Sequence, residues 1–262
     1  MTVIVMKNYV QAASLEEAYA LNKKSKKNAI LGGNLWRKMG IANIATGIDL
    51  CNLSLDTIEE TEEEYRIGCM CSLRDMEVNE SMHKEFSGAI KESLRHIVGV
   101  QFRNTATVGG SIFPRFGFSD VLTMVAALDT YVELYKGGIV PIKEFISMKP
   151  DDDILVRLII KKDGRKAAYQ THRMTETDFG VLTCAVSCKD EKYTVVLGAR
   201  PQKAKIVDNV DLSDAKDEEQ VDTFVKRVIE QVTFGSNMRG SAQYREVLAK
   251  VLIKRALSEL QA

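Results

Sequence analysis

Residues 103–122 read RNTATVGGSIFPRFGFSDVL. A glycine pair, Gly109–Gly110, follows a β-branched run, and bulky residues come directly after it. A second glycine pair lies in a similar context in ILGGNL, residues 30–35. Because glycine lacks a Cβ, it permits positive φ angles and lets consecutive backbone N–H groups face a ligand. Two such loops brought together would cradle an anion such as a pyrophosphate, and the alternative is a pair of tight turns.

The composition and the absent motifs exclude several classes of protein. The 36 Lys and Arg balance the 36 Asp and Glu, which disfavours a nucleic-acid partner and gives no reason to expect an anionic membrane surface. The sequence has no G-x-G-x-x-G, no P-loop, no H-E-x-x-H and no G-x-S-x-G motif, and its three histidines are scattered. We therefore expect no metal site and no catalytic side chain.

The N-terminal segment and the cysteines bear on location. MTVIVMKNYVQ lacks the basic and apolar regions of a signal peptide, and no apolar run is long enough to span a membrane. Five cysteines, an odd number, favour reduced thiols, and their spacing matches neither a zinc site nor an iron–sulfur cluster. We expect a cytoplasmic protein with structural cysteines.

The pattern along the chain predicts an α+β protein in two parts, residues 1–148 and 151–262, with the acidic run 151–153 at the boundary. Ser14 and Glu17 form a capping box that opens a helix, and a second helix is expected over 81–97. Four strands at 154–160, 167–174, 181–188 and 193–199 suggest an antiparallel meander. A long last helix is expected from Ser241, and one side of this helix is expected to consist of Tyr244, Val247, Leu248, Val251 and Leu252.

A resemblance to a known family extends this interpretation. Arg103 to Leu122 closely resembles the second flavin-binding motif of the FAD subunits of molybdenum hydroxylases, the medium-subunit relatives of xanthine dehydrogenase and carbon monoxide dehydrogenase. ILGGNL is similar to their first motif, and YVQAASLEEAYAL to their N-terminal segment. TDFGVLTCAV (177–186), VVLGARPQKA (195–204) and MRGSAQYREVLAKVLIKRAL (238–257) resemble their C-terminal domain. The resemblance covers nearly the whole chain, in order.

The resemblance implies a two-subdomain FAD-binding module of the PCMH type, with subdomains of about 1–53 and 54–148. A small C-terminal domain of antiparallel sheet and helices, 151–262, would follow it. The implied cofactor is FAD, with its pyrophosphate on the glycine loops, Asp120 on ribityl or ribose hydroxyls, and Leu155 near the isoalloxazine. For Leu155, a plain core position is the alternative. The implied cofactor-binding residues are Leu31, Gly32, Gly33, Asn34, Leu35, Thr107, Gly109, Gly110, Ser111, Asp120 and Leu155.

The sequence departs from the family pattern in Phe113–Ser119, FPRFGFS, which is bulkier and cationic. Arg115 would neutralise a phosphate or contact a partner, and Phe116 and Phe118 would stack on adenine or flavin. The alternative is that this segment fills a hydrophobic floor. Trp36 would cover the cofactor or simply pack. A basic residue of some relatives is replaced near Gln170 or Thr171, with Arg173 nearby.

The implied function is an electron-transfer flavoprotein subunit. Its partners would be a large subunit with a molybdenum cofactor and a small subunit with two iron–sulfur clusters, and NAD would be the electron acceptor. Flavin chemistry of this kind requires no general acid or base from the protein. The alternatives are a stand-alone flavin-dependent reductase or oxidase and a degenerate scaffold subunit without FAD.

Overall fold

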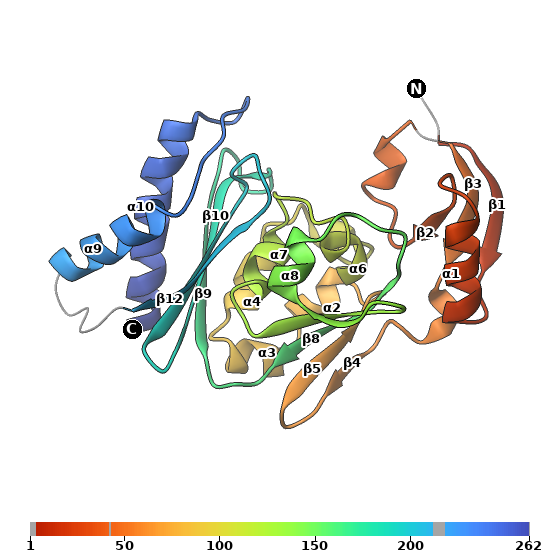
Figure 1. Cartoon of the computed structure of the whole chain (residues 1–262), viewed down its shortest axis with the longest axis horizontal. Coiled ribbons are helices and arrows are strands. Elements are labelled where there is room, and N and C mark those ends of the chain that lie inside the picture. The colour runs from red at the N-terminus through yellow and green to blue at the C-terminus, as the bar shows by residue number, and fades with distance from the viewer. Residues whose placement is uncertain (1–3, 42, 212–217, 262) are drawn as a thin grey trace. The chain divides into compact units, whose positions relative to one another are not determined.

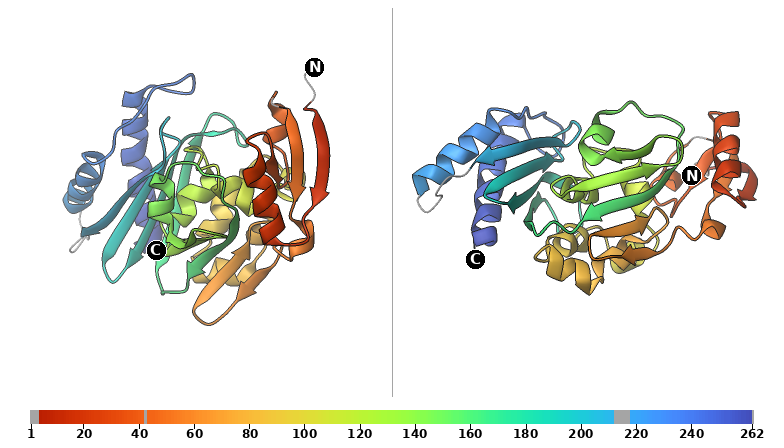
Figure 2. Two further views of the ribbon diagram at one scale, coloured as in Figure 1. Left: turned by 45° about the vertical axis from the view of Figure 1, so that its right-hand side comes forward. Right: turned by 60° about the horizontal axis from the view of Figure 1, so that its bottom comes forward.

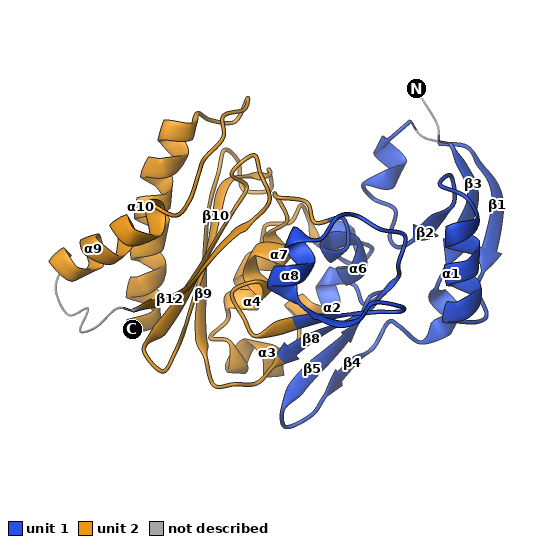
Figure 3. Ribbon diagram, viewed as in Figure 1, with its two compact units in different colours: residues 1–75, 100–114, 131–160 blue, residues 76–99, 115–130, 161–262 orange. Residues whose placement is uncertain are grey.

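The computed structural model describes residues 4–41, 43–211 and 218–261, shown in Figure 1. The first three residues of the N-terminal segment considered above therefore lie outside the described part. The chain divides into two compact units, which Figure 3 colours separately. Unit 1 comprises residues 1–75, 100–114 and 131–160, and unit 2 comprises residues 76–99, 115–130 and 161–262.

Unit 1 begins with a parallel three-stranded sheet in the order β1-β3-β2. Its strands are β1 (Met6–Gln11), β2 (Ala29–Leu31) and β3 (Ile44–Asp49), and helix α1 (Leu15–Lys24) joins β1 to β2. The predicted capping box is confirmed, since the Glu17 amide donates to Ser14 Oγ (3.1 Å) and the Glu17 carboxylate accepts from the Ala13 amide (2.8 Å). Strand β2 leads directly into the first glycine loop, and the 3₁₀ turns η1 (Arg37–Met39) and η2 (Cys51–Leu53) flank β3.

The larger sheet of unit 1 has five strands in the order β4-β5-β8-β6-β7. They are β4 (Ile58–Glu60), β5 (Glu64–Gly68), β6 (Thr130–Leu134), β7 (Gly138–Pro141) and β8 (Leu155–Lys161). The expected hairpin around Gly138 joins β6 to β7, and Gly138 has a φ of 68° there. Short helices accompany the sheet: α2 (Leu73–Glu77), α5 (Val100–Arg103), α6 (Val108–Ile112) and α8 (Ile142–Ser147).

Unit 2 is built on a four-stranded antiparallel sheet in the order β12-β11-β10-β9. Its strands are β9 (Lys166–Arg173), β10 (Gly180–Lys189), β11 (Lys192–Gly198) and β12 (Lys205–Asp211). The meander predicted from the sequence was wrong in one member. The strand at 155–161 pairs in the sheet of unit 1, and β12 provides the fourth strand here.

Helices α9 (Glu218–Ile229) and α10 (Ala242–Gln261) pack together on one face of this sheet, as Figure 2 shows. Helices α4 (Ala89–Arg95) and α7 (Asp120–Val125) contact its strands as well. Leu182, Cys184 and Val186 of β10 join the core under α10, whereas Thr183 contacts Thr123 of α7. Strand β10 is therefore covered on both faces, which explains why its sequence lacks polar alternation.

Two predicted helices differ from the structure. The helix expected over 81–97 is divided into α3 (Glu80–Glu85) and α4, because Ser87 and Gly88 adopt left-handed φ values of 52° and 80° between them. The face predicted for α10 was wrong for Tyr244, Val247 and Val251, which are exposed. It was right for Leu252, which is buried, and for Leu248, which packs against the core. The buried face of α10 consists of Arg245, Ala249, Leu252, Ile253, Ala256, Leu257 and Leu260.

Candidate functional site

The first glycine loop, residues 32–35, leaves the end of β2 and reverses the chain before η1. Asn34 adopts the left-handed conformation, with a φ of 57°, and its carbonyl accepts from the Lys38 amide (3.0 Å). No described residue accepts a hydrogen bond from the amides of Gly32, Gly33, Asn34 or Leu35. Consecutive amides without an internal acceptor around a left-handed residue suit an anion.

The two glycine motifs contact one another within unit 1. A Cβ atom at Gly33 would lie 1.8 Å from the carbonyl oxygen of Thr105, and one at Gly32 would lie 2.6 Å from Thr107 Oγ1. Both separations are far below van der Waals contact. Glycine is therefore required at these positions by close approach of the second motif to the first.

The second motif forms the short helix α6 rather than the end of a strand. Thr107 is its N-cap, and Thr107 Oγ1 accepts from the Gly110 amide (3.2 Å). The amides of Val108 and Gly109 donate to the carbonyls of Cys71 (2.9 Å) and Cys69 (2.8 Å), and the Ser111 amide donates to the Thr107 carbonyl. Unlike the first loop, this motif uses its own amides to fix its position.

The predicted reason for these glycines needs correction. None of the four motif glycines has a positive φ; the described glycines that do are Gly88, Gly138 and Gly164. A Cβ at Gly109 would lie 2.9 Å from Cys69 Cβ, and one at Gly110 would lie 3.1 Å from Thr107 Oγ1. The glycines allow backbones to approach, and the left-handed turn is made by Asn34.

Asp120, the first residue of α7, lies buried in unit 2. Ser119 caps this helix as expected, with Ser119 Oγ accepting from the Leu122 amide (3.1 Å). Asp120 Oδ1 accepts from the Tyr169 hydroxyl (2.6 Å) and from Arg173 Nη2, both on β9. Burial raises the pKa of the Asp120 carboxyl, and the Arg173 cation and the Tyr169 hydrogen bond oppose this effect. Burial also raises the pKa of Tyr169 well above its ordinary value, so its hydroxyl remains a donor at neutral pH.

The unusual segment Phe113–Ser119 makes close internal contacts. Phe116 and Phe118 stack on one another (5.0 Å between ring centroids), and the Phe118 ring meets Phe179 edge-on (4.9 Å). A Cβ at Gly117 would lie 1.9 Å from the carbonyl oxygen of Gln202, which explains the glycine between two phenylalanines. Arg115 is buried with a left-handed φ of 54°. These contacts show that residues 115–119 pack within unit 2, whereas the Phe113 ring contacts Phe145 in unit 1 (6.2 Å between ring centroids).

The remaining predicted residues occupy different environments in unit 1. Leu31 ends β2 and Leu155 begins β8, and both side chains are almost completely buried. Ser111 Oγ donates to the Thr107 carbonyl (3.0 Å). Trp36 is about half exposed (51%).

Each unit, taken by itself, contains residues that fit part of an FAD molecule. The first loop offers four amides without an acceptor among the described residues. The Thr107 hydroxyl lies so close to this loop that a Cβ at Gly32 would be only 2.6 Å from its oxygen. In unit 2, the buried Arg173 Nε has no hydrogen-bond partner among the described residues, and it belongs to the side chain that pairs with Asp120. The phosphate oxygens of a ligand satisfy the loop amides, and a carboxylate such as that of Asp120 accepts from ligand hydroxyls.

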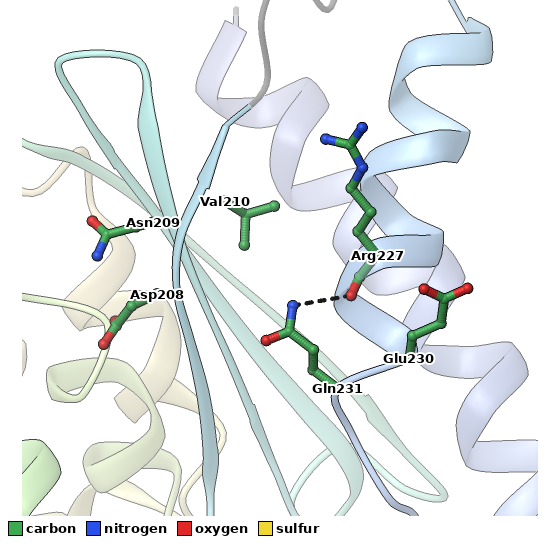
Figure 4. A pocket seen from close by; sticks show the side chains of 6 residues that line it. All are labelled: Asp208, Asn209, Val210, Arg227, Glu230 and Gln231. Carbon is green, nitrogen blue, oxygen red and sulfur yellow. Dashed lines mark hydrogen bonds between the residues drawn. The ribbon is translucent and has the colours of Figure 1, made fainter.

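The surface depression found in the described structure does not involve the predicted site residues. A surface depression of about 330 Å³ between β12 and α9 is lined by Asp208, Asn209, Val210, Arg227, Glu230 and Gln231, none of them a predicted site residue (Figure 4). Among the described residues, no group of three or more His, Cys, Asp or Glu side chains could hold a metal ion. No described helix combines the length and apolar character needed to cross a bilayer.

Sequence reasoning missed two contributors. The Thr105 carbonyl contacts Gly33, and the Tyr169 hydroxyl donates to Asp120, but the sequence pattern indicates neither role. Tyr169 and Arg173 are four positions apart on one strand, so their side chains point to the same face. That spacing is visible in the sequence, but it does not indicate which helix packs against this face of β9.

Comparison with known protein families gives matches along nearly the whole chain. Residues 5–162 match the family described as the FAD binding domain in molybdopterin dehydrogenase. Residues 167–260 match the CO dehydrogenase flavoprotein C-terminal domain.

Individual relatives are distant but collinear with the chain. The uncharacterized protein YgfM of Escherichia coli K12 is 23% identical over 98% of this chain and 97% of its own. The nicotine 6-hydroxylase medium subunit of Paenarthrobacter nicotinovorans is 23% identical over 97% of both. A chain of the carbon monoxide dehydrogenase of Hydrogenophaga pseudoflava superposes with a TM-score of 0.87 at 21% identity, covering 100% of this chain and 99% of that one, and shares its fold. This chain therefore belongs to the FAD-binding flavoproteins of the molybdopterin dehydrogenases, with FAD as its cofactor and oxidoreduction as its class of chemistry.

Proposed function

We propose that the chain is the electron-transfer subunit of a xanthine-dehydrogenase-like molybdenum hydroxylase. Electrons would arrive from a small subunit with two iron–sulfur clusters and leave to NAD, and a large subunit would carry the molybdenum cofactor. Support comes from the collinear relative described as a medium subunit, a word that implies further subunits in that protein. The domain limits of this proposal are 1–148 for the FAD-binding part and 151–262 for the C-terminal part.

The observation that carries the proposal is the row of free amides in the first glycine loop. Gly32, Gly33, Asn34 and Leu35 would bind the pyrophosphate of FAD through their backbone N–H groups, with Leu31 packed beneath them. The second motif would hold this loop in shape. Its Thr107, Gly109, Gly110 and Ser111 would complete the pyrophosphate site at the point where Thr107 meets Gly32.

Two further residues are assigned to other parts of the cofactor. Asp120 would accept hydrogen bonds from ribityl or ribose hydroxyls, and Leu155 would border the isoalloxazine. FAD supplies the chemistry when bound, because it can exchange electrons singly or in pairs. The chain's own residues bind and orient it, and no side chain is assigned a role in proton transfer.

The proposal is tested by co-expressing the chain with candidate molybdenum and iron–sulfur subunits and analysing the purified complex. We expect molybdenum, iron and FAD to co-purify with the chain in constant ratio. Recovery of the chain alone, with robust turnover of a small substrate, would instead favour a stand-alone flavin enzyme. Recovery of the complex without FAD, even after FAD is added, would favour a scaffold.

A further inference from the structure

Asp120 is part of a larger buried network in unit 2, which joins α7 to β9 and to the loop after β9. Both of its described side-chain partners, Tyr169 and Arg173, bind the same carboxylate oxygen, Oδ1. No described side chain donates to Oδ2. The two side-chain donors therefore fix the carboxylate through one oxygen and leave Oδ2 without a described side-chain donor.

Arg173 is the centre of the network. Only 6% of its side chain is exposed, and its guanidinium reaches Asp120 with Nη2 and the Asp178 carbonyl with Nη1. Asp178 is fixed in turn, because its carboxylate accepts from Arg239 Nη2 (2.9 Å) and from the Phe179 amide (2.7 Å). The carbonyl that orients Arg173 therefore lies in an anchored loop, and the guanidinium has little freedom to turn away.

Arg173 and the Tyr169 hydroxyl affect Asp120 in different ways. A carboxylate as buried as Asp120 is strongly disfavoured in its charged form unless a cation is in contact with it. Arg173 supplies that cation. Tyr169 supplies a neutral donor that fixes the rotation of the carboxylate without adding charge.

We propose that Arg173 and Tyr169 are positioning residues, which hold Asp120 ionised and oriented so that its Oδ2 accepts a hydroxyl of FAD. This inference rests on the proposed FAD site and adds to it two residues that act through Asp120. It assigns the affinity for FAD in part to β9, a strand of the C-terminal half of the chain.

The test is an FAD titration of the full-length chain by flavin fluorescence, with wild type, D120N, R173Q, R173K, Y169F and the double variant D120N/R173Q. R95Q, which changes an exposed arginine of the same unit, is the matched control. We expect D120N and R173Q each to weaken FAD binding about tenfold or more, the range of a lost charge-assisted hydrogen bond. We expect Y169F to have a smaller effect, R173K to regain part of the loss because it restores the cation, and R95Q to match wild type.

The double variant separates positioning from general damage. If Arg173 acts through Asp120, D120N/R173Q binds FAD no more weakly than the weaker single variant, whereas independent effects would multiply to about a hundredfold. Circular dichroism checks folding of each protein, and Y169F and R173K carry the test if R173Q does not fold. Multiplicative losses, or wild-type affinity in folded R173Q and Y169F, would overturn the inference.

The outcomes also separate this inference from the proposed function. A wild-type chain that binds no FAD contradicts the proposed function itself. If the wild-type chain binds FAD and D120N binds it with the same affinity, the proposed function is retained. Asp120, and with it Arg173 and Tyr169, is then not part of the site.

Discussion

Gly33 has less room for a side chain than any other glycine of the two motifs. A Cβ there would lie 1.8 Å from the carbonyl oxygen of Thr105, so the first loop could not keep its place against the second motif. The sequence predicted that both glycine pairs matter, and it predicted the residues. It could not predict the reason, because a close approach between residues far apart in the chain is invisible in a local pattern.

Replacing Gly33 with alanine should therefore damage both stability and cofactor binding. We expect G33A to lower the free energy of unfolding by at least about 2 kcal/mol, since the clash is with backbone that has to shift as a whole. The matched control is G40A, where a Cβ would meet its nearest neighbour, the Arg37 carbonyl oxygen, at 3.3 Å. Urea unfolding and FAD titration measure both effects, and a G33A protein as stable as G40A would refute the close approach.

The cysteines allow a second prediction at this scale. Burial raises the pKa of Cys69 and of Cys71 to about 12, so the reactive thiolate is on the order of one part in ten thousand at pH about 8. Cys184 is fully buried, whereas Cys51 is exposed. Alkylation followed by mass spectrometry should label Cys51 in the native protein, and Cys69, Cys71 and Cys184 only after unfolding. Rapid native labelling of Cys69 or Cys71 would contradict the packing around the second motif.

Helix α10 shows what a hydrophobic pattern leaves undecided. The sequence predicts the helix and its start correctly, since the Tyr244 amide donates to Ser241 Oγ (3.1 Å). It predicts the buried face only in part because Arg245 is buried, and its guanidinium donates to the carbonyls of Val181, Gly235 and Gly240 and to Asn237. A buried arginine satisfied by four acceptors turns the helix, and Tyr244, Val247 and Val251 are left outside.

Arg245 should therefore be a major contributor to the stability of unit 2. We expect R245M to lower the free energy of unfolding by about 3 kcal/mol or more, because it leaves buried acceptors without a donor. The control is R255M on the exposed face of the same helix, which should change stability by less than about 0.5 kcal/mol. Equal unfolding midpoints for the two variants in urea would show that the hydrogen bonds of Arg245 do not stabilise unit 2.

At the scale of the whole molecule, the order of motifs along the chain carried more information than the periodicity of any one segment. The family and FAD follow from motifs that extend from the first glycine loop to α10. The pairing of β8 with strands of unit 1 could not be predicted, because β8 and β9 both have strand patterns and follow each other closely, and only long-range pairing assigns them to different sheets. The hydrogen bonds of Asp120 to β9 could not be predicted either, because they too join residues far apart in the chain.

The proposed electron acceptor gives a prediction for the whole protein. Anaerobic addition of NADH to the FAD-loaded chain should bleach the visible flavin absorbance, because the reaction with NAD is reversible in principle. Dithionite, which reduces accessible flavin without a binding site, is the control for complete reduction. A flavin that dithionite bleaches and NADH does not would show that the acceptor is another compound.

The central claim, that the bare first loop binds the pyrophosphate of FAD, is tested most directly by comparing FAD with FMN. FMN has the isoalloxazine and ribityl groups but no pyrophosphate. Titration of the full-length chain, followed by flavin fluorescence, should saturate at one FAD per chain, and FMN should bind at least about tenfold more weakly, the difference expected for loss of charge-assisted hydrogen bonds to the loop amides. A chain that binds FMN as tightly as FAD, or binds neither, would contradict the account.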